Sequence, residues 1–273
     1  MRNFEFENWD NGQLTVNAKF ASVLKANGFS TFDALMNDSS GEVAKNLLRE
    51  RITSRFSLPD SNGKELTFYI KKHQPPPIKE YIKPFFRLTW PILGAKNEWN
   101  AILGFHESEI TTMVPVAFGE KKGQSFVITQ AVEGCEKLSD WMETRLANGS
   151  RDEEQTANIV NEVARIAKQM HGAGLHHQDF YLTHLLRSLN NENSEIHVID
   201  LGRARRRNGL SRRWIIKDLA QLNYSAHLFS DEDRQRFLET YFGRPINASD
   251  KPLLRSIRRK TERIASHSRK NRL

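Results

Sequence analysis

The hydrophobic pattern of this chain changes its period near Leu138, and that change limits the fold more than any other feature of the sequence. Before it, strand signals dominate. Apolar residues roughly alternate over 46–58, and the Asn62-Gly63 turn signal joins that segment to a returning strand at 66–73. A second hairpin is predicted over 114–132, and a short helix over 95–105. The first half of the chain is therefore expected to be mainly β-sheet.

After Leu138 the apolar residues recur at helical spacing. The clearest helix is predicted over 152–175, where glycines close an apolar face made of Ile159, Val163, Ile166 and Met170. Two short strands are expected near 183–189 and 195–201, and helices again beyond Ser211. A β-rich part followed by a helix-rich part predicts an α+β protein of two lobes, which we place at residues 1–133 and 134–273.

Cysteine content and the N-terminal sequence argue for a cytoplasmic protein. The 273 residues include one cysteine, Cys135, so one chain cannot form a disulfide framework, and this fits a reducing compartment. The opening MRNFEFENWDNGQ lacks the apolar core of a secretory signal. No stretch approaches the roughly 18 apolar residues of a membrane-spanning helix.

The net charge of +8 resides in the C-terminal tail. Residues 251–273 contain nine Lys or Arg and one acid, which leaves 32 bases and 32 acids in the rest of the chain. Leu254, Ile257 and Ile264 recur there at helical spacing, so the tail reads as a final helix of the second lobe, as a basic amphipathic helix on an anionic membrane, or as both. A second run, residues 203–213, holds six arginines. Such clusters attract phosphorylated sugars, anionic lipids or nucleic acid, although many are only solvated surface.

Two aspartates stand where phosphoryl-transfer chemistry would need them. Asp179 follows the glycine-terminated helix, and Asp200 ends the apolar strand IHVID. Two acids at the ends of neighbouring strands can face one cleft, where one orients an acceptor hydroxyl and the other holds Mg²⁺ against nucleotide phosphates. A single aspartate at a strand end is usually a turn residue, but the pair with a hairpin between its members is more specific.

These segments resemble known kinases. HHQDFYLTH resembles the catalytic loop of protein kinases, IDLG their D-F-G motif, FYIKKH the strand with the phosphate-binding lysine, and KNEWNAI the helix with its glutamate partner. More closely, HGAGLHHQDFYLTHLL, VIDLGRARRR and KDLAQLNYSA resemble the lipopolysaccharide core kinases, the family of heptose and Kdo kinases. The resemblance extends from Gly41 to Ser225. It implies a bilobal protein-kinase-like fold with a β-rich N-lobe and a mainly α-helical C-lobe.

The resemblance also implies a reaction and its residues. The enzyme would transfer the γ-phosphoryl group of ATP, with Mg²⁺, to a heptose or Kdo hydroxyl of the lipopolysaccharide inner core. Asp179 matches the catalytic base and Asp200 the metal-binding acid. Lys71 matches the lysine that steadies the phosphates, Glu98 its partner, and the adjacent Lys72 leaves the lysine assignment open by one position.

Supporting residues follow from the same resemblance, with some departures from the kinase pattern. His177 and Asp218 match the histidine and the buried helical aspartate that brace the catalytic loop. His184 replaces the asparagine that is the second metal ligand of protein kinases, as it does in the lipopolysaccharide kinases, so it could bind metal or phosphate. Gln178 replaces the loop arginine, which argues against control by a phosphorylated activation loop.

The glycine-rich loop is nearly absent. Gly41 alone, with Ser39 and Ser40, stands where a phosphate-covering turn would be, and an ordinary hairpin turn fits it as well. The three histidines of HHQDFYLTH lack the spacing of a zinc motif, and the single cysteine supplies no thiolate set, so a zinc site is not expected.

The arginine run suggests how an acceptor would be held. Arg203, Arg205, Arg206 and Arg207 directly follow the metal-binding aspartate and would line the acceptor side, where an anionic core sugar would suit them. Bare surface or a localisation signal are the competing explanations. The expected partners are the lipopolysaccharide inner-core glycolipid and, through the basic tail, the inner face of the cytoplasmic membrane. No nucleic acid is expected.

Two other functions stay open. The chain could be a kinase-fold enzyme with a protein or small-molecule acceptor, because the ATP-site residues are common to all such enzymes. It could also be a non-catalytic kinase-like module that binds nucleic acid or a membrane, and the degenerate glycine loop favours this reading. The presence of Lys71, Glu98, Asp179 and Asp200 in kinase order argues against the module.

Overall fold

The computed structural model describes residues 3–48, 51–75, 94–147, 152–189 and 195–270. Its contacts divide the chain into two compact units. The first unit consists of Met1–Leu103 and Met113–Val132, and the second of Gly104–Thr112 and Glu133–Leu273. The expected mixture of a β-rich first part and a mainly helical second part is confirmed.

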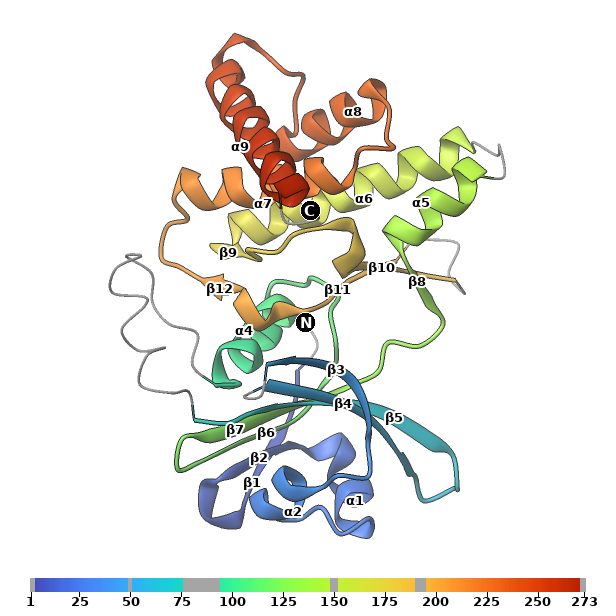
Figure 1. The fold of residues 1–273 in the computed structure, drawn as a ribbon, viewed down its shortest axis with the longest axis vertical. Helices are drawn as coiled ribbons and strands as arrows, with labels where there is room; N and C mark the ends of the chain where they lie inside the picture. Colours follow the sequence, from blue (N-terminus) through green and yellow to red (C-terminus); the bar gives the residue numbers. More distant parts are fainter. Residues whose placement is uncertain (1–2, 49–50, 76–93, 148–151, 190–194, 271–273) are drawn as a thin grey trace. The chain divides into compact units, whose positions relative to one another are not determined.

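A seven-stranded antiparallel sheet forms the body of the first unit, in the order β1-β2-β6-β7-β5-β4-β3. The strands are β1 (Phe6–Trp9), β2 (Leu14–Asn17), β3 (Glu42–Leu48), β4 (Arg51–Pro59), β5 (Glu65–His73), β6 (Pro115–Lys121) and β7 (Gln124–Gln130). Helices α1 (Ala18–Ala26) and α2 (Phe32–Asn37) cover one face of this sheet (Figure 1). Aromatic contacts fill the interface between them, such as the edge contact of Phe20 with Phe68 and the stack of Phe32 on Phe126.

Turn chemistry accounts for most of the strand boundaries. The predicted turn at Asn62-Gly63 joins β4 to β5, and Gly63 has the positive φ that such a turn requires. The single strand expected over 46–58 is wrong, because the structure has two strands, β3 and β4, paired antiparallel across this segment. The sequence at 49–50 is Arg-Glu, with no Gly, Pro, Asn or Asp to signal a turn there.

Gly41 lies immediately before β3, in the segment that follows α2, and not in a turn between two paired strands. A Cβ at this position would come within 2.9 Å of the Arg55 carbonyl oxygen, so glycine allows the close approach of the two backbones. This local packing explains the glycine without a phosphate.

The second unit is built on five long helices: α5 (Leu138–Ala147), α6 (Glu153–Gly172), α7 (Arg212–Ser225), α8 (Asp231–Phe242) and α9 (Lys251–Lys270). The predicted apolar face of α6 is buried, and Asp152 caps its N-terminus by accepting the Gln155 N–H. Helix α7 packs on α9 and also contacts η2, a short 3-10 turn (Leu182–His184). Within the described residues, no helix is long and apolar enough to cross a membrane.

Short strands bring distant segments of the second unit together. Strands β8 (Cys135–Lys137), β10 (Leu185–Ser188) and β11 (Ile196–Val198) form one sheet, and β9 (Leu175–His176) pairs with β12 (Arg205–Arg206). Gly174, at φ +74°, allows this second pairing, because a Cβ there would meet the Arg207 carbonyl oxygen at 2.3 Å. The segment after α6 is thereby held beside the arginine run.

Candidate active site

In the first unit, Lys71 and Glu98 form a close ion pair. Lys71 lies in β5, and Glu98 lies in the first turn of α4 (Lys96–Glu107), which confirms the predicted helix. Lys71 Nζ donates to Glu98 Oε1 at 2.7 Å, and the Glu98 side chain is only 4% exposed. The neighbouring Lys72 points the other way, as alternation along a strand requires, and donates to the Asp38 carbonyl at 2.5 Å. Burial lowers the pKa of Lys72. The structure therefore joins Lys71, and not Lys72, to Glu98.

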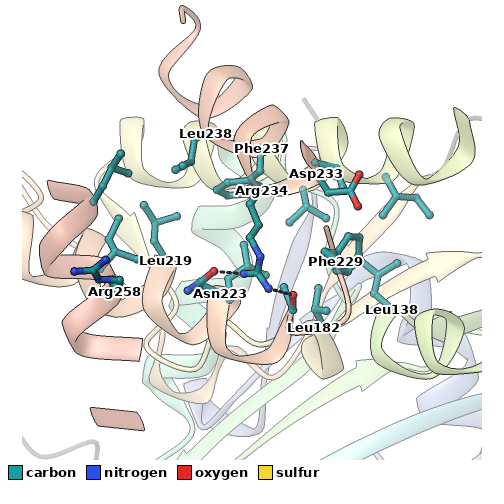
Figure 2. A pocket seen from close by; sticks show the side chains of 17 residues that line it. Leu138, Leu182, Leu219, Asn223, Phe229, Asp233, Arg234, Phe237, Leu238 and Arg258 are labelled. Carbon is teal, nitrogen blue, oxygen red and sulfur yellow. Dashed lines mark hydrogen bonds between the residues drawn. The ribbon is translucent and has the colours of Figure 1, made fainter. Parts of the chain in front are cut away.

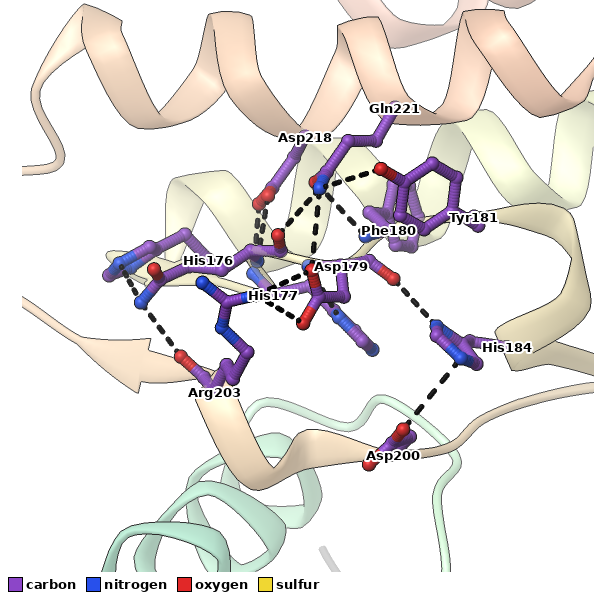
Figure 3. A network of polar contacts seen from close by, with 11 residues as sticks. His176, His177, Asp179, Phe180, Tyr181, His184, Asp200, Arg203, Asp218 and Gln221 are labelled. Atoms are coloured by element: carbon purple, nitrogen blue, oxygen red, sulfur yellow. Dashed lines mark hydrogen bonds and ion pairs between the residues drawn. The ribbon is translucent and has the colours of Figure 1, made fainter. Parts of the chain in front are cut away.

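In the second unit, α7 holds the segment 177–182, which we call the catalytic loop (Figure 3). The fully buried Asp218 accepts the His177 N–H through Oδ2 and the Gln178 N–H through Oδ1, both at 2.8 Å. Burial alone would raise the pKa of Asp218, but hydrogen bonding and charge, from His171 first and then from His177, together hold that pKa below its usual value. A charged acceptor thus fixes the start of the loop.

The remaining amides of the catalytic loop are also paired. Gln221 Oε1 accepts the Phe180 N–H at 3.3 Å, and Ser225 Oγ accepts the Leu182 N–H at 3.0 Å. The two others bond within the loop: the Asp179 N–H to His177 Nδ1 and the Tyr181 N–H to the Asp179 carbonyl. Every backbone N–H from His177 to Leu182 therefore has an acceptor, so the loop has one well-defined conformation.

His177 is a bracing residue with a defined tautomer. Its Nδ1 accepts the Asp179 N–H, so the proton lies on Nε2, which faces the Ile199 carbonyl at 3.0 Å. Burial lowers the pKa of His177, which keeps the ring neutral. Its ring stacks on His184 at a centroid distance of 5.8 Å. His177 therefore links Asp179 to the strand that leads to Asp200.

Asp179 presents its carboxylate to Arg203. The Arg203 Nη1 lies 3.1 Å from Oδ1 and 3.2 Å from Oδ2 of Asp179, and the arginine side chain is 55% exposed. The Arg203 backbone is held separately, because Gln178 Nε2 donates to its carbonyl at 2.8 Å. Burial, followed by the charge of Arg203, lowers the pKa of Lys217 to about 8. The surroundings of Asp179 are therefore electropositive.

Asp200 and His184 face each other beside the catalytic loop (Figure 3). His184 Nδ1 is 2.7 Å from the Asp179 carbonyl, which can only accept, so Nδ1 carries the proton. In the neutral ring, Nε2 then directs a lone pair at Asp200 Oδ2, 3.7 Å away. Asp200 has φ 58°, a left-handed conformation that is rare outside glycine. Two acceptors aimed at each other suit a cation between them, so these residues fit a divalent metal.

Within the described residues, no group of three or more His, Cys, Asp or Glu side chains is gathered as a metal cluster. Two protein ligands nevertheless suffice for Mg²⁺ in phosphoryl-transfer sites, since nucleotide phosphates and water complete its coordination. His176 lies apart from this pair, because it is fully buried and its ring packs on Trp214 at a centroid distance of 4.5 Å.

The four arginines at the start of the run, in residues 203–207, have different partners. Only Arg203 contacts Asp179. Arg206 pairs with Glu107 at 2.7 Å and also donates to Ser108 Oγ, in the 104–112 segment of the second unit. Arg207 lies over the Trp214 ring at 5.1 Å, and burial lowers the pKa of Arg205, in strand β12. The structure does not bring Arg205, Arg206 and Arg207 to Asp179.

The structure places several further residues at this site that the motifs did not indicate. Gln221 and Ser225 contact the catalytic loop, and His171 lies between Asp218 (3.5 Å) and the Tyr241 hydroxyl (2.9 Å). One signal was available: Asp218, Gln221 and Ser225 are polar residues at helical spacing, so they lie on one face of α7. Nothing in the sequence indicates what that face contacts.

Known proteins resemble this chain over most of its length. Residues 37–241 match the model of the lipopolysaccharide kinase (Kdo/WaaP) family. An Escherichia coli protein named lipopolysaccharide core heptose(I) kinase WaaP is 36% identical over 217 residues, or 76% of this chain and 79% of that protein. A Pseudomonas aeruginosa protein of the same name is 33% identical over 219 residues, 72% of this chain and 78% of that protein.

A solved structure agrees with these matches. The structure titled WaaP in complex with acyl carrier protein superposes with a TM-score of 0.66 at 30% identity, covering 85% of this chain and 95% of that chain. The expected kinase-like fold and the family resemblance read from the motifs are confirmed. This chain belongs to the lipopolysaccharide kinase (Kdo/WaaP) family.

Proposed function

We propose that this kinase transfers the γ-phosphoryl group of ATP to a hydroxyl of a heptose in the lipopolysaccharide inner core. The observation that carries the proposal is the arrangement in the second unit, where Asp179 and Asp200 are joined through His184 and the bonded catalytic loop. Heptose is favoured over Kdo because the relatives with 33% or more identity are named heptose(I) kinases.

The first unit would bind the nucleotide. A lysine held at 2.7 Å by an almost fully buried glutamate has little freedom, so its remaining N–H donors can be directed at the α- and β-phosphates. Asp200 and His184 would hold Mg²⁺, which when bound neutralises charge on the phosphates. Gly41 contributes little to this proposal, because packing against β4 already explains it.

The second unit would supply the base and the acceptor site. Asp179 would accept a hydrogen bond from the attacking hydroxyl and orient it for in-line attack. In the structure Arg203 contacts both carboxylate oxygens, so the hydroxyl has to share or displace this contact. A carboxylate or phosphate on the acceptor would attract the half-exposed Arg203 and leave Asp179 free. Arg203 is therefore the acceptor-side arginine of this proposal.

The test is radiolabel transfer from ATP with Mg²⁺ to core lipopolysaccharide lacking its phosphate, with the Asp179→Asn protein in parallel. The expected result is label on the heptose that falls about 10³-fold or more in the variant. Nucleotide binding without transfer to lipopolysaccharide would mean that the acceptor is a different molecule, such as a protein or a small molecule. Failure to bind Mg-ATP would reject catalysis and favour a binding module.

A carrier protein is a further proposed partner. An apolar cavity of about 340 Å³ lies in the second unit, lined by leucine, isoleucine and valine side chains of α5 to α9, including Leu138, Leu219 and Leu238 (Figure 2). Its polar lining includes Arg234, which bonds Asn223 and the Ala226 carbonyl. We propose that it accepts the acyl chain of an acyl carrier protein, because a relative was solved with such a partner. Binding of acylated but not unacylated carrier protein, measured by calorimetry, is the expected result.

Because the proposed acceptor is a glycolipid, the transfer reaction would take place at a membrane surface. Exposed bases line α9, among them Arg255, Arg259 and Arg263, and Glu262 is the only acid in that helix. We propose that this face attracts the anionic inner face of the cytoplasmic membrane. Co-sedimentation with anionic phosphatidylserine vesicles, lost with neutral phosphatidylcholine vesicles and at high salt, is expected. Equal binding to both vesicles would contradict this assignment.

A further inference from the structure

Gln221 contacts the catalytic loop at several points. It lies in the middle of α7, and it is 4% exposed. Its Nε2 donates to the Gln178 carbonyl at 2.7 Å, and its Oε1 accepts the Phe180 N–H at 3.3 Å. These two peptide groups stand immediately before and after Asp179. The same Nε2 lies 3.2 Å from the Tyr181 hydroxyl and 3.5 Å from Asp179 Oδ1.

The orientation of this amide is determined by its partners. A carbonyl oxygen can only accept, so the group at 2.7 Å from the Gln178 carbonyl has to be the NH₂ end. A backbone N–H can only donate, so the end facing Phe180 has to be the oxygen. Turning the amide over would place oxygen against oxygen and nitrogen against nitrogen at two buried contacts. Gln221 thus donates one hydrogen bond to the loop backbone and accepts another from it.

Gln221 supports a backbone conformation of the loop that is intrinsically unfavourable. Gln178 has φ 72°, in the left-handed region that a residue with a side chain seldom adopts. Asp218 fixes the amides of His177 and Gln178, and Ser225 fixes that of Leu182. Between these ends, Gln221 is the α7 side chain that holds the peptide groups around the carboxylate.

We propose that Gln221 is a positioning residue for Asp179: by bonding the peptide groups on both sides of it, Gln221 sets where the carboxylate points. This rests on the proposed function in one respect, namely that Asp179 is the base. Asp218 anchors the start of the loop, whereas Gln221 determines the direction of the reacting group. A misplacement of about 1 Å at such a group costs on the order of 100-fold in rate.

The decisive variant is Gln221→Met, which keeps the length and burial of the side chain but removes its donors and acceptor. Gln221→Glu keeps an oxygen for the Phe180 N–H and turns the other end into an acceptor facing the Gln178 carbonyl. Thr240→Val is the matched control, because Thr240 bonds Asn161 between α8 and α6, in the same unit but without contact to the catalytic loop. Melting temperatures show whether the variants fold.

Three measurements separate positioning from stability. We expect kcat for transfer to core lipopolysaccharide to fall about 10- to 100-fold in both Gln221 variants, with KM for ATP within about threefold of wild type. We expect Thr240→Val to lower the melting temperature and leave kcat unchanged. In an Asp179→Asn background, Gln221→Met should change the residual rate less than about threefold, because a residue that acts through Asp179 has nothing left to orient.

Hydrogen exchange tests the inference without any acceptor. Peptides that contain 177–182 should exchange about tenfold faster in Gln221→Met, while α6 peptides exchange as in wild type. If the wild-type protein transfers no label to lipopolysaccharide, the proposed acceptor fails, and hydrogen exchange alone then decides the role of Gln221. Unchanged exchange in the catalytic loop, an unchanged kcat, or an additive loss in the Asp179→Asn background would overturn the proposal.

Discussion

Replacing Asp218 by asparagine should destabilise the second unit strongly, although the side chain keeps its size. Asp218 is fully buried, and each of its carboxylate oxygens accepts one backbone N–H at 2.8 Å. In Asp218→Asn one oxygen becomes an NH₂ group that faces an N–H donor, so the His177 or the Gln178 amide loses its acceptor. The other amide keeps a neutral acceptor in place of a charged one.

The size of the effect follows from these two bonds. Losing a buried hydrogen bond to a charged group costs about 1.5–3 kcal/mol, and weakening the second from charged to neutral costs about 1 kcal/mol. Asp218 is 0% exposed, so bulk solvent does not contact the carboxylate to replace these bonds. The expected loss is therefore roughly 2.5–4 kcal/mol of unfolding free energy, a large share of the roughly 5–15 kcal/mol that stabilises an ordinary domain.

The assay is urea unfolding at pH 7, followed by hydrogen exchange of α6 peptides, which report on the second unit alone. Asp231→Asn is the control, because Asp231 is a fully exposed acid of the same unit, and its change should stay within about 0.5 kcal/mol. A midpoint for Asp218→Asn equal to that of the control would refute the reasoning, since it would mean that the buried carboxylate does not hold the catalytic loop.

Three further outcomes are expected. Burial lowers the pKa of His176 to about 4, so between this value and the ordinary pKa near 6.5 the unfolded chain binds a proton that the folded chain does not. The free energy of unfolding should therefore fall as the pH drops through this range, by about 2 kcal/mol at pH 5. His176→Gln should flatten that pH dependence when denaturation is compared at pH 7.5 and pH 5. Lys71→Ala should weaken Mg-ATP binding about 10- to 100-fold in calorimetry. Lys72→Ala, which loses a bond to a backbone carbonyl, should change the affinity less than about threefold. A larger loss of affinity in Lys72→Ala than in Lys71→Ala would assign the phosphate-binding role to Lys72. Arg203→Gln should raise the KM of the core acceptor about tenfold, while Arg206→Gln, which breaks a pair with Glu107, should leave that KM unchanged.

The parts of the site that could be predicted are those encoded by short segments. Asp179 and Asp200 each stand in a local motif, and Lys71 and Glu98 each belong to one element whose period is visible in the sequence. Helix α6 was equally predictable, because its buried face repeats over five turns and a cap begins it. These features depend on neighbours within a few residues along the chain, so a linear pattern carries them.

The parts that could not be predicted depend on contacts between distant segments. The hairpin of β3 and β4 lacks a turn signal, so the alternating pattern reads as one strand. The four arginines of residues 203–207 look equivalent in sequence, but only Arg203 reaches Asp179 after β9 pairs with β12. Gln221 lies about forty residues beyond the loop that it contacts.

Periodicity and short motifs are properties of the chain alone, so they are enough to predict the fold class, the kinase motifs and the order of the proposed site residues along the chain. Three features came from the folded structure: the lysine that meets Glu98, the arginine that faces Asp179, and the polar face of α7 that supports the catalytic loop. Each of these features is a contact between segments that are distant along the chain, so no short stretch of sequence encodes it. A side chain's partner is set by where helices and strands pack, and burial then turns that meeting into a strong constraint, because a buried polar group has to find its partner within the protein.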